Sequence, residues 1–175
     1  MTLKTQQKRI YIRRAWLAAA VLIASVLQNT KGMFPQVFGV RALLLIPFVT
    51  AIAMYERDIA GIFYGLFAGA LWDIFAAGNN FNAIYLVVVG FACGTLINTI
   101  MRSNFVTHAI LSGGFTLIYC LGYWLYHYVI FNLDKAAVML MRYYIPAVIY
   151  TLVLSPLVFF IVRAIEKRYR TEQYA

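Results

Sequence analysis

The feature that most constrains this fold is the separation of its charged residues from its apolar sequence. Five Lys and Arg residues lie in the first fourteen positions, and four more lie between positions 163 and 170. Of the 175 residues, 63% are hydrophobic and only 12% are charged, against roughly 25% charged in an average soluble domain. So little charge cannot cover a globule in water. The chain is therefore predicted to be a membrane protein.

The apolar sequence is divided into stretches of membrane-spanning length. A helix needs about 20 apolar residues to cross a hydrocarbon core of roughly 30 Å, and short polar turns interrupt the chain at 56–58, 78–80, 102–104 and 132–135. Six such spans use most of the chain and leave no room for a second domain. We predict one all-α, polytopic membrane domain over 1–175, with spans at about 15–28, 41–55, 59–77, 81–101, 106–131 and 143–162.

The basic residues predict the orientation of these spans. Counted on alternate sides of the membrane, eleven Lys and Arg residues share the side of the chain ends, and four lie opposite. The positive-inside rule then places both termini in the cytoplasm, which agrees with an even number of spans. The net charge of +9 is explained by these span ends, so we expect contact with membrane lipids and no nucleic-acid partner.

The third predicted span carries a stripe of small residues. Gly61, Gly65, Gly69, Asp73 and Ala77 follow one another at intervals of four. Because four residues make nearly one helical turn, these positions share one helix face and let another backbone approach closely. That backbone belongs either to a helix of the same chain or to a partner protein, and the spacing does not distinguish the two.

Asp73 is the one acidic residue inside a predicted span. A central Asp costs roughly 2.5–3.5 kcal/mol on insertion, so its carboxylate needs a partner. We expect a structural ion pair or a hydrogen-bonded carboxylate, and Arg41 and Arg142, which begin the second and sixth spans on the same side, are the expected ion-pair partners. A contact with a partner protein, or a proton or ligand site, is the alternative.

Other chemistry-bearing residues are few. Cys93 and Cys120 stand alone in apolar runs and are expected to be small buried side chains. His108 and His127 are isolated near the ends of the fifth span and are expected at the membrane interfaces. The spans hold no paired acid and base, nucleophile with a base, or metal-ligand set. We therefore expect no catalytic residue, metal or cofactor.

Residues 56–94 resemble a known family. A short charged turn, Gly-x-x-x-Gly-x-x-x-Gly-x-x-x-Asp and Gly78-Asn79-Asn80 before another apolar span are similar to the central region of MreD, the bacterial rod-shape-determining membrane protein. The resemblance implies a non-catalytic inner-membrane scaffold of the cell-wall elongation complex. It implies binding to MreC and, directly or through MreC, to the RodA polymerase and its class B penicillin-binding partner.

The same resemblance implies a fold akin to the substrate-binding S subunits of energy-coupling-factor vitamin transporters, which are the alternative function. Such a subunit needs a ligand pocket of polar and aromatic groups beneath its outer loops. The residues available for one are Asn79, Asn82, Trp124 and Tyr126, although the asparagines also suit a plain turn.

Overall fold

The computed structural model describes residues 3–30, 32–33, 35–36, 39–56, 58–75, 81–130 and 136–169. The regular elements of these residues are helices, which confirms the all-α prediction. In chain order they are α1 (Leu3–Asn29), α2 (Leu45–Glu56), α3 (Asp58–Phe75), α4 (Asn82–Thr99), α5 (Phe105–Trp124), the π-helical η1 (Leu125–Ile130), α6 (Ala136–Met139), the π-helical η2 (Leu140–Tyr144) and α7 (Ile145–Tyr169).

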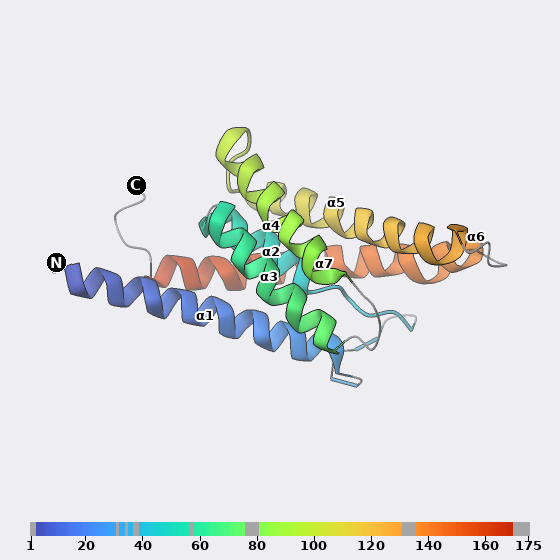
Figure 1. The fold of residues 1–175 in the computed structure, drawn as a ribbon, viewed down its shortest axis with the longest axis horizontal. Helices are drawn as coiled ribbons and strands as arrows, with labels where there is room; N and C mark the ends of the chain where they lie inside the picture. Colours follow the sequence, from blue (N-terminus) through green and yellow to red (C-terminus); the bar gives the residue numbers. More distant parts are fainter. Residues whose placement is uncertain are drawn as a thin grey trace.

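α2 lies at the centre of the bundle. It contacts α1, α3, α4, α5 and α7, and those five helices contact one another in a ring around it (Figure 1). All ten residues from Leu45 to Met54 are buried, as expected for a helix that is apolar on every side. A hydrogen bond connects the first turn of α2 to α1: the backbone N–H of Leu45 donates to Gln28 Oε1 at 3.0 Å.

The second predicted span differs from the structure at its start. The prediction began this span at position 41, whereas residues 40–44 are non-helical and the helix begins at Leu45. Pro47 gives the physical reason. In a helix starting at position 41, Pro47 would lie in the interior. There its ring would clash with the preceding turn, and it has no N–H to donate to the helix hydrogen-bond pattern. In α2 it lies in the first turn, where that N–H has no partner within the helix.

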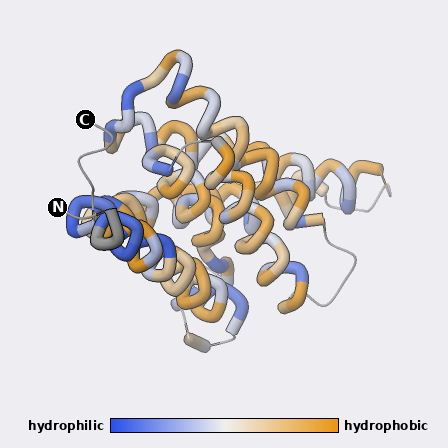
Figure 2. The backbone as a smooth tube through the Cα atoms, turned by 60° about the vertical axis from the view of Figure 1, so that its left-hand side comes forward, coloured by the Kyte–Doolittle hydropathy of each residue, from blue (hydrophilic) through white to orange (hydrophobic). Residues whose placement is uncertain are grey.

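The helices have the length and composition of membrane spans. Four are long and apolar enough to cross a membrane: Gln6–Asn29, Asn82–Thr99, Phe105–Ile130 and Ala136–Tyr169. Leu45–Glu56 and Ile59–Phe75 are shorter apolar helices; α2, at about 18 Å, is shorter than the hydrocarbon core. Figure 2 shows hydrophobic residues along the helices and hydrophilic residues at the start of α1. The chain is thus a multi-pass membrane protein.

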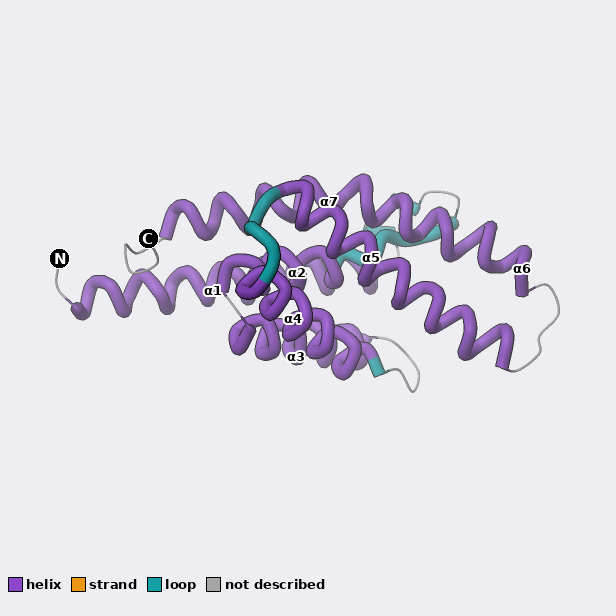
Figure 3. The backbone as a smooth tube through the Cα atoms, turned by 90° about the horizontal axis from the view of Figure 1, so that it is seen from above, coloured by secondary structure: helices purple, strands orange, loops and turns teal. Residues whose placement is uncertain are grey.

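The two ends of the bundle differ. The start of α1 and the end of α7 lie at the same end (Figure 1), which we call the basic end; the opposite end is the far end. At the far end, α5 with η1 and α6 with α7 extend beyond the other helices (Figure 3). Residues 136–169 form one continuous helical segment, so the helix leading into the last predicted span begins before position 143.

Candidate functional site

The glycine stripe packs inside the molecule. A Cβ atom added at Gly61 would lie 2.6 Å from the carbonyl oxygen of Gly90, and one added at Gly65 would collide with the carbonyl oxygen of Leu86. One added at Gly69 would collide with Cα of Ala83. α3 and α4 therefore touch backbone to backbone along the stripe. Of the two alternatives for the stripe, the structure places a helix of the same chain against it. Ala77 lies outside the described residues.

Asp73 caps α4. Its Oδ1 accepts a hydrogen bond from the backbone N–H of Asn82 at 3.1 Å, and its Oδ2 accepts one from Ala83 at 3.0 Å. These N–H groups belong to the first turn of α4, where no intrahelical partner exists and a negative charge is favoured by the helix dipole. The carboxylate thus joins the two helices of the α3–α4 hairpin.

The expected ion pair of Asp73 is not present among the described ion pairs, which all involve Arg13 or Arg14. Arg41 instead donates to the backbone carbonyl of Asn29 at 3.4 Å, and its Nε and Nη2 lie 3.1 and 3.2 Å from the side-chain amide of Gln36. Arg142 lies exposed in η2. Asp73 does not need an arginine, because two backbone N–H groups already satisfy its carboxylate.

The four residues proposed for an outer pocket are not brought together as expected. Asn82 is buried and accepts a hydrogen bond from the Tyr119 hydroxyl at 2.7 Å. Trp124 donates to the backbone carbonyl of Ala136 at 2.8 Å, and Tyr126 is 56% exposed. Asn79 lies outside the described residues.

A cavity of about 290 Å³ does lie at the far end, and of the three described residues Asn82, Trp124 and Tyr126 only Asn82 lines it. Tyr119 stands in its wall, with its ring 5.2 Å from the ring of Trp72 and 6.0 Å from that of Tyr123. Arg41 lies at the same cavity. The aromatic and cationic lining suits a small polar or anionic organic molecule.

A buried cluster of charges lies at the basic end. Arg13 Nη2 is 2.5 Å from Glu56 Oε1, and Arg13 Nη1 is 3.4 Å from Glu166 Oε2. Their side chains are only 4–8% exposed. Arg14 adds a longer contact with Glu56, at 3.9 Å. The cluster joins α1, α2 and α7, and buried charges of this kind are stable only when paired.

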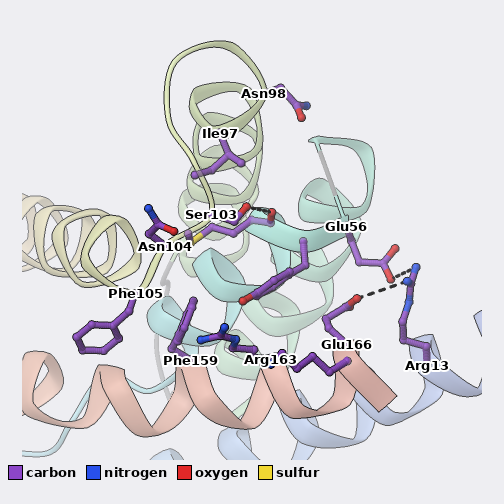
Figure 4. A pocket seen from close by; sticks show the side chains of 13 residues that line it. Arg13, Glu56, Ile97, Asn98, Ser103, Asn104, Phe105, Phe159, Arg163 and Glu166 are labelled. Atoms are coloured by element: carbon purple, nitrogen blue, oxygen red, sulfur yellow. Dashed lines mark hydrogen bonds and ion pairs between the residues drawn. The ribbon is translucent and has the colours of Figure 1, made fainter. Parts of the chain in front are cut away.

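A second cavity, of about 470 Å³, opens beside this charge cluster. Figure 4 shows its walls: α7 with Arg163 and Glu166, Glu56 at the end of α2, and the segment leading into α5 with Ser103 and Asn104. This cavity is larger than the far-end cavity, and more charged side chains line it.

The charge cluster was not predicted. From the sequence, Glu56 was expected in a polar turn and Arg13 at a span end. The signal was present, because Glu56 and Glu166 are two of only six acidic residues and both belong to the strongly basic side of the chain. The sequence could not show that α1, α2 and α7, which are far apart along the chain, come together at this point.

His108 also differs from expectation. It is fully buried rather than interfacial, and its Nε2 lies 3.1 Å from the carbonyl oxygen of Pro47 and 3.3 Å from Thr50 Oγ1. The Pro47 carbonyl also accepts a hydrogen bond from Thr50, so His108 joins α5 to the first turn of α2. His127 is half-buried and stacks on Tyr123 at 4.0 Å.

The described part of the chain contains no cluster of side chains suited to metal or thiol chemistry. No group of three or more His, Cys, Asp or Glu side chains there is placed to hold a metal ion. Cys93 and Cys120 are free thiols and are buried.

Comparison with known proteins leaves the family open. No protein-family model matches the chain, and neither curated proteins nor solved structures include a significant match.

Proposed function

We propose that this protein is a non-catalytic membrane scaffold of the bacterial cell-wall elongation complex, as its resemblance to MreD implies. The observation that carries the proposal is the α3–α4 hairpin. The glycines and the aspartate that carry the resemblance form one structural unit, in which Gly61, Gly65 and Gly69 admit α4 and Asp73 caps it. Because each of these residues has a defined packing or capping role, together they support the resemblance more strongly than scattered small residues would.

The proposal includes six membrane spans and an inner-membrane location with both termini in the cytoplasm. α2 and the buried residues before it together make the second span, and α3 makes the third. The basic end then faces the cytoplasm, in keeping with the positive-inside rule. MreC is the direct partner, and RodA with its class B penicillin-binding protein binds directly or through MreC. Because α4 covers the glycine stripe, the partner contact uses another, lipid-facing surface.

Affinity purification in mild detergent tests the proposal. The tagged protein, expressed in its own rod-shaped host, is expected to copurify with an MreC-like protein, and its depletion is expected to round the cells. Restoring the wild-type chain is the control and should restore rods. Normal rods after depletion, together with no wall-synthesis protein in the purified fraction, would refute the scaffold function.

A substrate-binding S subunit of an energy-coupling-factor vitamin transporter is the second candidate. The observation that favours it is the far-end cavity, whose lining of Arg41, Trp72 and tyrosines meets the requirement for converging polar and aromatic groups. The same purification separates the two functions, since an S subunit should bring down a transporter ATPase. Depletion should then impair vitamin uptake and leave cell shape unchanged.

A further inference from the structure

The basic-end cavity is lined by two basic side chains that lie outside the ion pairs of the described residues. Arg163 and Lys167 lie one turn apart on α7, and both line the cavity. Neither forms an ion pair with any side chain that the structure describes. The two carboxylates in the same wall, Glu56 and Glu166, are buried against Arg13. The lining thus carries three cations and two carboxylates, a net charge of +1, and the two cations of α7 lie outside the ion-paired cluster.

Arg163 lies against an aromatic ring of its own helix. Its guanidinium carbon lies 5.9 Å from the ring centre of Phe159, a cation–π distance. Phe159 is 1% exposed, so the ring is a fixed support. In Figure 4 the Arg163 guanidinium lies beside Phe159, whereas Glu166 extends toward Arg13. Arginine presents five N–H donors in a planar fork that suits phosphate oxygens.

Further donors around the cavity lack acceptors. Arg13 is 5% exposed and lines the cavity, and its Nε has no hydrogen-bond partner among the residues that the structure describes. α5 begins at the same cavity, and its N-cap residue, Asn104, makes no side-chain cap. The first N–H groups of α5 thus carry the positive end of a 20-residue helix without a capping side chain. Buried or cap-position donors normally find an acceptor, and an anion bound in the cavity would supply one to these donors.

The surface beside the cavity is apolar. Phe105 lines the cavity and stacks on Phe160 of α7, with ring centres 6.0 Å apart. Phe105 is 39% exposed and Phe160 is 56% exposed. A ligand with a phosphate in the cavity can therefore lay an acyl chain against these rings, which a soluble phosphate compound cannot do.

We propose that this cavity binds the phosphate headgroup of an anionic phospholipid, with Arg163 and Lys167 as the charged contacts. The inference goes beyond the scaffold function and does not depend on it. The chemistry shared by all candidate ligands is an anionic phosphate. The two possible sources are a lipid of the surrounding leaflet and a soluble phosphate ester, and the exposed phenylalanines favour the lipid.

Thermal unfolding of the purified full chain in neutral detergent tests the assignment. Short-chain dioctanoyl phosphatidylglycerol should raise the unfolding temperature in a saturable way, whereas the zwitterionic phosphatidylcholine of the same chain length should not. In the double variant Arg163→Gln, Lys167→Gln, the concentration of phosphatidylglycerol for half the effect should rise roughly tenfold or more, given about tenfold per 1.4 kcal/mol and about 1 kcal/mol per basic contact.

Matched variants guard against general charge effects and misfolding. Arg9→Gln with Arg168→Gln removes two exposed basic residues from the same end but outside the cavity, and it should keep the wild-type response. Arg163→Lys keeps the charge and should retain part of the response, and lipid-free unfolding temperatures verify that each variant folds. An equal response to glycerol 3-phosphate would identify a soluble ligand and overturn the lipid assignment. No phosphatidylglycerol response, or equal loss in both double variants, would overturn the site.

Discussion

Arg13 connects three helices through its ion pairs, a role that its position at a predicted span end does not indicate. Its guanidinium is the shared partner of two buried carboxylates on different helices. With Gln at this position, Glu56 and Glu166 would stay buried with their main compensating charge removed, although Arg14 still lies 3.9 Å from Glu56. We expect Arg13→Gln to destabilise the protein by about 3–5 kcal/mol, measured as a fall in unfolding temperature in detergent.

The control at this scale is Arg9→Gln, an exposed neighbour on the same helix, for which we expect a change within about 0.5 kcal/mol. The double variant Arg13→Gln, Glu56→Gln should recover part of the loss, because it removes one uncompensated charge. Strictly additive effects of the two substitutions would show that the pair does not couple α1 to α2.

At the scale of the element, the α3–α4 hairpin depends on backbone contact. Gly65→Ala adds the smallest possible side chain, and that atom would collide with the carbonyl group of Leu86. Because a backbone carbonyl in a helix cannot turn aside, α4 must move and its contacts with α3 are lost. We expect a cost of about 1–3 kcal/mol and a lower yield of folded protein in size-exclusion chromatography.

Gly114→Ala is the matched control for this hairpin, since Gly114 is also helical but has no atom within 4 Å of an added Cβ. It should be neutral or stabilising by up to about 1 kcal/mol, as for Gly to Ala within a helix. Equal behaviour of the two variants would mean that close approach of α3 and α4 is not required for folding.

At the scale of the whole molecule, the basic end should face the cytoplasm. Single cysteines introduced at Lys8 and Arg168, in a chain whose native Cys93 and Cys120 are replaced by Ala, should be protected from a membrane-impermeant thiol reagent in intact cells. A cysteine at Met33, which is 59% exposed and follows α1 at the far end, should be labelled. The positive-inside asymmetry is the reason, and labelling of both basic-end positions with protection of position 33 would reverse the topology.

The sequence by itself determined what depends on local composition. Long apolar runs between polar turns predict helices of membrane length because the hydrocarbon core excludes unsatisfied backbone groups, and the positions of most helices follow. The four-residue spacing of Gly61, Gly65 and Gly69 predicted a close-packing face for the same local reason. The start of α2 was predicted wrongly, at position 41, although Pro47 favours a later start because proline is disfavoured in a helix interior.

Only the tertiary structure decided which groups meet. Asp73 was expected to pair with an arginine, but its carboxylate accepts hydrogen bonds from the first N–H groups of α4. Arg13, Glu56 and Glu166 lie on three helices far apart in sequence, and no periodicity relates them. Such pairings depend on how helices are placed around α2, and that placement results from the packing of all the elements at once. A spacing along one helix cannot contain that information.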